Sequence, residues 1–348
     1  MLLNIGGVFC GGTMSSNIIL VTGGAGFIGA NITREYIKKK LNNQQIKIHI
    51  LVHPTESLWR LFDVLENIII HVCDITDYDA IQKIIYLIKP TIIYHLASFG
   101  GMPHQNNQKI IFDVNVSGTI NLFNACKDVG FDCFVNVGSS SEYGIKNVPM
   151  HEQMILEPVS DYAVSKAAAT QFCLKEALIN KLPVYTVRPF SVYGDYEIET
   201  RLIPTLLMTV IKKNEVSLSS PHFVRDFIYI KDIVDLFINI AEKKPQQHFI
   251  FNAGTGVQSS IQDVIILLQN QMQENIIVHW GSSPSRLWEP ITWCADMTLV
   301  ENVIGWKITT TLVLGIALSL RWFEANQILY LKKAMLKKND AYKKSKMI

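Results

Sequence analysis

Serine, tyrosine and lysine side chains occur at two places in the sequence with a spacing suited to proton transfer. The stretch "VGSSSEYG" (137–144) follows an apolar run and contains three consecutive serines, the first being Ser139. Alone, it is best interpreted as a polar loop, because Ser and Gly are ordinary turn residues. In "SDYAVSKAAAT", Tyr162 and Lys166 are four residues apart and therefore lie on one face of a helix. Such residues are often only surface neighbours, but an ammonium beside a phenol lowers the phenol pKa toward a catalytic range.

The elements that must position these side chains can be predicted from the apolar pattern. Short, mostly continuous apolar runs predict strands buried on both faces of a parallel sheet, at residues 17–23, 46–53, 68–74, 90–97, 133–139 and 183–189. The segments between them have helical spacing, and strand–helix alternation is typical of an α/β doubly wound sheet. We predict a Rossmann-like domain over residues 17–190, to which a later part (225–256) returns. Shorter elements punctuated by Pro and Gly predict a smaller, mixed α/β substrate lobe, mainly over residues 191–325.

A glycine-rich turn joins the first predicted strand to the first predicted helix. In "LVTGGAGFIGA", Gly23, Gly26 and Gly29 allow a tight turn, a close approach of pyrophosphate and close packing of helix on strand. Helix N–H groups then face the phosphates. This context predicts a nicotinamide dinucleotide site that also includes Phe27 and Ile28. A positively charged nicotinamide would join Lys166 in lowering the pKa of Tyr162, and Lys166 is also expected to bind the nicotinamide ribose.

The end of the second predicted strand bears on the choice between NAD and NADP. His53 stands where an acid usually binds the ribose 2′-hydroxyl of NAD, and Arg60 lies just beyond it. Because no carboxylate occupies that place to repel a 2′-phosphate, we favour NADP slightly, although Glu56 lies nearby. Asp74 and Ile75 follow the third strand and are expected at the adenine end. Asp74 is alternatively a helix cap.

Together, several motifs resemble the extended short-chain dehydrogenase/reductase family, which contains nucleotide-sugar epimerases, dehydratases and ketoreductases. The resemblance covers roughly residues 17 to 325 and rests on the glycine turn, "YHLAS" (94–98), "NVSGTINL" (115–122), "VGSSSEYG", the Tyr162–Lys166 pair, "RPFSVYG" (188–194), "RDFIYIKDIV" (225–234), "FNAGTG" (251–256) and "WEPITWCAD" (288–296). It implies a nucleotide-sugar substrate and a homodimer. It also adds four cofactor-binding residues, Leu96, Ala97, Ser98 and Pro189.

The resemblance assigns a role to the serine stretch. Ser139 matches the Ser or Thr that hydrogen-bonds the reacting sugar oxygen, which makes Ser139, Tyr162 and Lys166 the expected catalytic residues. Ser140 and the serine after it stand where 4,6-dehydratases of the family carry an Asp–Glu pair. Water elimination needs such an acid and base, and Glu142 is one position out of register, so dehydratase activity is disfavoured.

Substrate-binding positions also follow from the resemblance, namely Asn115, Ser140, Ser191, Arg225 and Arg286. Asn115 is alternatively a helix cap, and either arginine is alternatively a solubilising charge. At Ser191, relatives commonly have Asn. We expect an NAD(P)-dependent C4 ketoreductase of a nucleotide-linked 4-keto-6-deoxy sugar, with a C4 epimerase as the alternative. Intact catalytic residues argue against a non-catalytic regulatory protein that only binds the cofactor.

Composition excludes other classes. The chain has 348 residues, 49% of them hydrophobic and 18% charged, with a formal net charge of +2, which describes a compact globular protein without an electrostatic reason to bind nucleic acid. Six scattered cysteines without a CxxC pair predict no metal site and a cytoplasmic location. "TLVLGIALSL" (311–320) is too short to span a membrane. We expect residues 1–16 to be a disordered leader, with Met14 as an alternative start, and residues 326–348 to be a Lys-rich tail.

Overall fold

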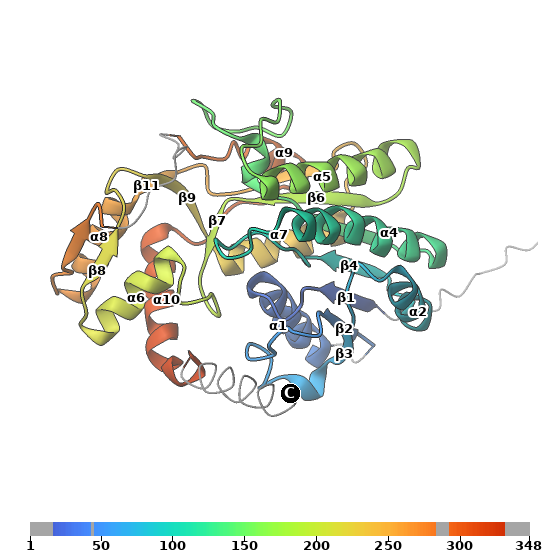
Figure 1. Ribbon diagram of the computed structural model, residues 1–348, viewed down its shortest axis with the longest axis horizontal. Coiled ribbons are helices and arrows are strands. Elements are labelled where there is room, and N and C mark those ends of the chain that lie inside the picture. Colours follow the sequence, from blue (N-terminus) through green and yellow to red (C-terminus); the bar gives the residue numbers. More distant parts are fainter. Residues whose placement is uncertain (1–16, 43–44, 283–291, 331–348) are drawn as a thin grey trace, which may run out of the picture.

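The computed structural model describes residues 17–42, 45–282 and 292–330 (Figure 1). The expected leader (1–16) and most of the expected Lys-rich tail lie outside the described residues. Within them, seven strands form a central parallel sheet in the order β10-β6-β5-β4-β1-β2-β3. The strands are β1 (Ile18–Thr22), β2 (Lys47–Val52), β3 (Ile69–Val72), β4 (Ile92–His95), β5 (Cys133–Val137), β6 (Val184–Pro189) and β10 (Ile250–Ala253). The prediction of a doubly wound parallel sheet is therefore confirmed.

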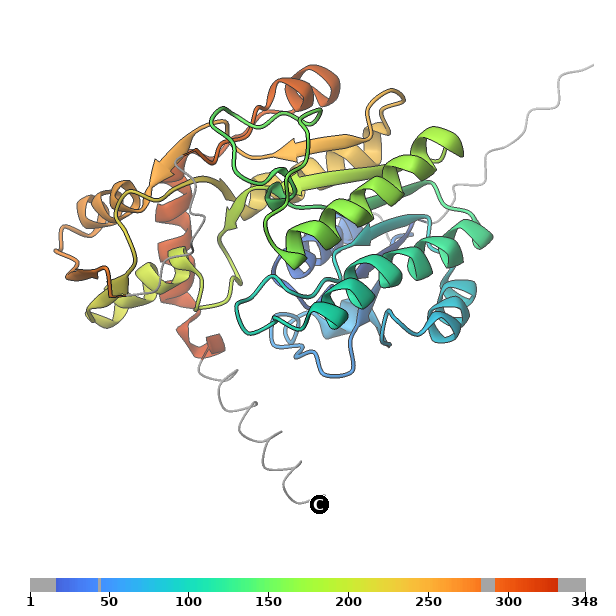
Figure 2. The ribbon, with the colours of Figure 1, turned by 45° about the horizontal axis from the view of Figure 1, so that its top comes forward.

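Helices cover both faces of this sheet, which explains its continuous apolar runs. They are α1 (Phe27–Asn42), α2 (Tyr78–Ile88), α3 (Gln108–Phe112), α4 (Gly118–Val129), α5 (Asp161–Ile179) and α7 (Ile230–Lys243), with short 3₁₀ helices η1 (Leu65–Asn67) and η3 (Ser140–Tyr143) and a π-helical segment η2 (Asp113–Ser117). Side chains of α1 and α7 share one apolar core, and those of α2, α4 and α5 share another. The tilted view of Figure 2 shows α4 and α5 side by side across the second face.

Smaller elements form the part of the molecule that Figure 1 shows on the left. They are β7 (Ser191–Tyr193), β8 (Val216–Leu218), β9 (Val224–Tyr229), β11 (Gln258–Ser260), β12 (Val278–Trp280), α6 (Leu202–Lys212), α8 (Ile261–Met272) and α10 (Leu312–Ala325), whereas α9 (Thr298–Ile304) packs against β10 and α7 of the central sheet. Strand β9 pairs parallel with β7 and antiparallel with β11, while β8 pairs with β12. The apolar run 311–320 forms most of α10, whose Ile316 and Phe323 are fully buried. Among the described helices, none has the length and apolarity needed to cross a membrane.

The parallel sheet brings the predicted site together at one edge. The glycine turn follows β1, Leu96 follows β4, the serine stretch follows β5, and Phe190 follows β6. Because these strands are parallel neighbours, their carboxyl ends lie at the same edge. The order of the strands reverses between β1 and β4, and ligands of open α/β sheets bind at such a switch point.

Candidate active site

The glycine turn between β1 and α1 leaves room for backbone only. Gly23 has φ +62°, and a Cβ atom on it would lie 2.8 Å from the backbone nitrogen of Ala97. The N–H of Gly26 donates to the carbonyl of Gly23 at 2.9 Å, and a Cβ on Gly29 would lie 2.5 Å from that same oxygen. α1 begins directly after the turn, at Phe27. This side-chain-free cradle at a helix N-terminus fits a dinucleotide pyrophosphate.

His53, at the end of β2, lies against a carboxylate that comes from another strand end. The N–H of Thr55 donates to His53 Nδ1 at 3.2 Å, so the neutral ring carries its proton on Nε2. That nitrogen is 3.6 Å from Oδ2 of Asp74, which follows β3. Burial raises the pKa of Asp74, but hydrogen bonds from the N–H and hydroxyl of Thr76, together with His53, lower it by more, so that the pKa lies below its usual range. The premise that the β2 end lacks a carboxylate is therefore corrected.

Two further predicted cofactor residues point elsewhere. Arg60 is 7% exposed and donates to the carbonyls of Ala25 at 3.1 Å and Tyr196 at 2.7 Å. It thus supports the glycine turn from behind and does not reach toward a 2′-phosphate. The side chain of Ile75 is buried in the core under α4, where Gly118 leaves space for it. Both side chains have packing roles, and a cofactor contact of either residue stays a prediction.

The β4 end is held by a buried chain of hydrogen bonds through His95. Its Nδ1 lies 2.8 Å from the hydroxyl of Thr22, which accepts from the N–H of Ala97. Its Nε2 lies 2.8 Å from the hydroxyl of Thr119, which donates to the carbonyl of Asn115 at 2.6 Å. Burial, aided by the charge of Lys166, lowers the pKa of His95 to about 3, so the ring is neutral. The chain fixes Leu96 and Ala97, which are half-buried, next to the exposed Ser98.

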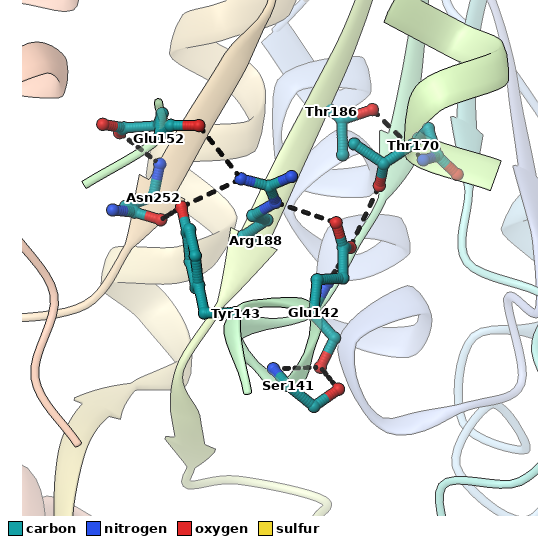
Figure 3. A network of polar contacts seen from close by, with 10 residues as sticks. Ser141, Glu142, Tyr143, Glu152, Thr170, Thr186, Arg188 and Asn252 are labelled. Atoms are coloured by element: carbon teal, nitrogen blue, oxygen red, sulfur yellow. Dashed lines mark hydrogen bonds and ion pairs between the residues drawn. The ribbon is translucent and has the colours of Figure 1, made fainter. Parts of the chain in front are cut away.

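Residues 138–144, hereafter the serine turn, direct some side chains toward solvent and others into the protein interior. Ser139 N-caps η3, with its hydroxyl 2.7 Å from that of Ser141, and both serines are partly exposed. Glu142 is fully buried: its Oε1 accepts from the N–H of Ser139 at 2.8 Å, and its Oε2 accepts from Nε of Arg188 at 2.9 Å. Figure 3 shows Arg188 between Glu142 and Tyr143. A capping box therefore fixes Ser139 to the buried ion pair.

Tyr162 and Lys166 occupy the first turns of α5 and both are turned toward the protein. The hydroxyl of Ser139 lies beside that of Tyr162 and acts on its pKa as a hydrogen-bond partner, which brings the two catalytic candidates together. Burial raises the pKa of Tyr162 above its ordinary value, while Arg201 and the Ser139 hydrogen bond lower it in part. Burial lowers the pKa of Lys166 to about 8. In the chain alone, the Tyr162 phenol is therefore protonated at neutral pH, and the lowering of its pKa by Lys166 together with a bound nicotinamide stays a prediction.

Asn115 supports this region from the protein interior. It is 1% exposed, and its amide exchanges hydrogen bonds of 2.8 Å with both backbone groups of Phe99. It also donates to the hydroxyl of Ser165 at 2.9 Å. Asn115 thus clamps the loop after β4 to α5 from within a π-helical segment, a feature frequent at functional sites. These contacts fit the supporting role that the family resemblance implies for Asn115, its substrate contact stays a prediction, and it does not cap the helix that follows.

The remaining predicted substrate residues are more scattered. Ser140 is buried (5% exposed), so its side chain does not face outward with Ser139. Ser191 and Arg225 lie on the adjacent strands β7 and β9, where Ser191 pairs with Phe227, and the Arg225 guanidinium is 5.9 Å from the Trp293 ring centre. Pro189 is buried at the end of β6. Arg286 lies outside the described residues.

Sequence reasoning missed two features beside Tyr162. The ring of Tyr162 lies against Gly100 (φ +98°) and Gly101, and a Cβ on Gly101 would be 4.0 Å from that ring. The exposed Arg201 donates to the carbonyl of Gly101 at 2.7 Å, which brings a guanidinium next to the tyrosine. The paired glycines after "YHLASF" were a usable signal. Arg201 had none, because its position depends on the loop that precedes α6.

Comparison with known proteins defines the class. The profile of the NAD dependent epimerase/dehydratase family matches residues 19–254, so the chain belongs to that family. The chain is 28% identical over 262 residues to a dTDP-D-glucose 4,6-dehydratase from Dictyostelium discoideum, covering 71% of this chain and 60% of that protein. It is 27% identical to a UDP-glucuronate 4-epimerase from Thermodesulfobacterium geofontis (88% and 96% covered). It is 29% identical to a GDP-6-deoxy-D-talose 4-dehydrogenase from Aggregatibacter actinomycetemcomitans (78% and 88% covered).

Solved structures share the fold. The dTDP-glucose 4,6-dehydratase from Bacillus anthracis in complex with NAD superposes with a TM-score of 0.79 at 22% identity, covering 89% of this chain and 97% of that one. The UDP-glucuronic acid 4-epimerase from Bacillus cereus in complex with UDP-glucuronic acid and NAD gives 0.76 at 24% identity, covering 88% and 99%. These likenesses confirm the architecture, and the family confirms an NAD-dependent enzyme class.

Substituting Gly26 with Val tests the cradle. The added Cβ would lie 2.9 Å from the Gly23 carbonyl and its methyl groups would occupy the space above the turn. We expect the affinities for NADH and NADPH to fall by about tenfold or more, because the pyrophosphate must approach the backbone. Fluorescence titration with each nucleotide measures this.

Gly130→Ala is the control for general destabilisation, since Gly130 has φ +78° but open space around it. Its affinity for both nucleotides should match the wild type. Unchanged affinity in Gly26→Val would contradict the assignment of the cradle.

Proposed function

We propose that this chain is an NAD(P)-dependent oxidoreductase that reduces C4 of a nucleotide-linked 4-keto-6-deoxyhexose. The observation that carries the proposal is that the serine turn presents the Ser139 hydroxyl beside Tyr162 of α5, while its carboxylate, Glu142, faces inward. Two hydroxyls suffice to hold and protonate one sugar oxygen. Elimination of water would need an additional acid and base, and Ser140, Ser141 and the buried Glu142 do not supply them.

The protein groups have distinct roles in this reaction. Ser139 and Tyr162 bind the C4 carbonyl oxygen, and Tyr162 gives its phenolic proton to that oxygen as C4 becomes an alcohol. Burial raises the pKa of Tyr162, so the phenol is protonated before transfer, and the charge of Lys166 offsets the weaker acidity that burial causes. Lys166, whose pKa is about 8, is mostly an ammonium at neutral pH and stabilises the phenolate left behind. A bound reduced nicotinamide dinucleotide supplies the hydride.

One relative supports the substrate class. The name of the Aggregatibacter protein, a GDP-6-deoxy-D-talose 4-dehydrogenase, describes oxidation at C4 of a nucleotide-linked 6-deoxyhexose. The proposed reduction is the same chemistry in the opposite direction. Because this relative is 29% identical over 88% of its own length, its name supports the proposal without establishing the sugar.

Cofactor choice follows from the β2 end. The expected slight preference for NADP depended on the lack of a carboxylate there, and Asp74 provides one at 3.6 Å from His53. A carboxylate repels the 2′-phosphate of NADP and can bind the 2′-hydroxyl of NAD. We therefore propose NAD as the preferred cofactor, in agreement with the NAD named for both solved neighbours.

A C4 epimerase is the second candidate. An exchangeable NADPH would favour a reductase over an epimerase, which retains its cofactor. Proposing NAD removes this argument against the epimerase. Arg201, exposed and bonded to Gly101 beside the Tyr162 ring, favours it specifically. Its guanidinium would pair with a carboxylate on the sugar, as present in the substrate named for the UDP-glucuronate 4-epimerases.

A homodimer remains a proposal. Apolar side chains on the outer side of α5 and the neighbouring α3 support it, because Ile110 (42% exposed), Val164 (40%) and Leu178 (55%) face solvent. Light scattering of the purified protein would measure the molar mass, and a monomer at micromolar concentration would contradict it.

Replacing Asp74 with Asn should shift cofactor preference toward NADP. Removal of one carboxylate near the 2′ position is expected to raise the NADPH/NADH affinity ratio by about tenfold, or about 1.4 kcal/mol. Fluorescence titration of both nucleotides measures the ratio. Glu56→Gln removes a charge from the segment after β2 while keeping the backbone bond from Glu56 N–H to the His53 carbonyl, and should leave the affinity ratio near the wild-type value. An equal rise in both variants would show a general charge effect instead.

Tyr162→Phe tests the reaction. Loss of the general acid should lower turnover by about 100-fold or more with little change in KM, whereas Ser139→Ala should cost less because Tyr162 still holds the oxygen. The assay mixes enzyme, NADH or NADPH and a panel of 4-keto nucleotide sugars, and follows loss of reduced-nicotinamide absorbance.

Stoichiometric oxidation of the cofactor supports the ketoreductase. Interconversion of C4 epimers of a UDP-hexose or UDP-hexuronate without added reduced cofactor would establish the epimerase instead. Formation of a 4-keto sugar with release of water would contradict the interpretation of the serine turn.

A further inference from the structure

Glu142 has a place in the site that catalysis by Ser139, Tyr162 and Lys166 does not explain. Besides Ser139 and Arg188, it bonds to the hydroxyl of Thr170, which donates to Oε1 at 3.0 Å. Thr170 lies one helical turn beyond Lys166 on α5, and both side chains are buried, so they share the inward face of that helix. The Glu142 carboxylate therefore faces the part of α5 that carries the lysine.

The other titratable groups around Lys166 are neutral. Burial raises the pKa of Cys173, on the same face of α5, to about 12. His95, from the end of β4, has a pKa lowered to about 3, mainly by burial, and that of Tyr162 is raised by burial. Among these groups of the described residues, Glu142 supplies the negative charge.

We propose that Glu142 is the counter-ion of Lys166, a positioning residue that holds the backbone of Ser139 and keeps the buried ammonium charged. The inference rests on the proposed function, in which Ser139, Tyr162 and Lys166 are the catalytic residues. It adds Glu142 to these three residues. Glu142 lies one position away from the acidic pair that the dehydratases of the family carry in this turn.

Two observations support this role. Burial strongly lowers the pKa of Lys166, and Glu142 is the largest influence that raises it again. Gly138 is matched to the inward carboxylate, since a Cβ on it would lie 2.5 Å from Glu142 Oε1. Any larger residue at the start of the turn would push the carboxylate from its place. The inward position of Glu142 therefore requires glycine at position 138 of "VGSSSEYG".

The sign of the expected pH effect follows directly. Lys166 is charged below its pKa of about 8 and loses the charge above it. Without the Glu142 charge, the ammonium is less favoured, so its pKa falls and the charge is lost at a lower pH. Any property that needs the ammonium, including its hydrogen bond to the cofactor ribose, should then decline at a lower pH.

Glu142→Gln tests the inference by cofactor binding. The affinity for NADH is measured by fluorescence titration between pH 6 and pH 10. In the wild type it should decline as pH rises through about 8, and in Glu142→Gln the midpoint should move down by roughly one pH unit. Thr170→Val is the matched control, because it removes a hydrogen bond to the same oxygen but leaves the charge. Its midpoint should equal that of the wild type.

Several outcomes would overturn the proposal. They are a flat wild-type profile, an unchanged midpoint in Glu142→Gln, or an equal shift in Thr170→Val. Should Glu142→Gln fail to fold because Arg188 is left unpaired, the double variant Glu142→Gln/Arg188→Gln removes both buried charges. A downward shift is expected there too, smaller than in the single variant because loss of the Arg188 positive charge offsets part of the loss of the Glu142 charge. An unshifted midpoint in the folded double variant overturns the proposal.

The same experiment separates this inference from the proposed function. A shifted NADH midpoint in a protein that reduces no 4-keto sugar would retain the counter-ion and reject the ketoreductase. Reduction of such a sugar with no shift in Glu142→Gln would retain the ketoreductase and reject the counter-ion.

Discussion

A guanidinium and a carboxylate that meet in the interior determine where the catalytic groups lie. Arg188 and Glu142 are each at most 1% exposed, and taking such charges out of water costs several kcal/mol per ion unless every polar atom finds a partner. The partners come from four elements: the turn itself, α5 through Thr170, β6 through Arg188, and β10 through the bond from Tyr143 to Asn252 at 2.7 Å (Figure 3). Breaking one half of such a pair typically costs about 3–5 kcal/mol. The serine turn therefore has one position relative to α5.

Much of the fold could be predicted because it is written in local patterns. Continuous apolar runs predicted the first six strands of the sheet. The glycine pattern predicted the turn between β1 and α1. The Tyr162–Lys166 pair was recognisable because helical spacing alone puts both residues on one face. Each of these signals lies within about ten residues of sequence. β10 was not among the predicted strands, although it lies within residues 225–256, which were predicted to return to this domain.

The parts that sequence reasoning misplaced depend on distant neighbours. His53 meets Asp74 only because β2 and β3 are adjacent, so the charge at the β2 end cannot be read from the β2 stretch. Arg60 turns toward Ala25 and Tyr196, which lies 136 residues away. Asn115 and Ile75 stand at motif positions, yet both are buried and serve the scaffold. A motif places a residue near the site, whereas the direction of its side chain depends on what packs around it.

The serine turn shows why one short stretch cannot serve every reaction of its family. A carboxylate can face the substrate as an acid or base, or it can anchor the turn from beneath, but it cannot do both. In this chain Glu142 is the anchor, bound on three sides by Ser139, Thr170 and Arg188. What remains toward the substrate is a pair of serine hydroxyls, which bind oxygen and relay protons but do not abstract a proton from carbon. Under the proposed function, the inward glutamate therefore both holds the catalytic groups and limits the chemistry to exchange of a hydride and a proton at one carbinol centre.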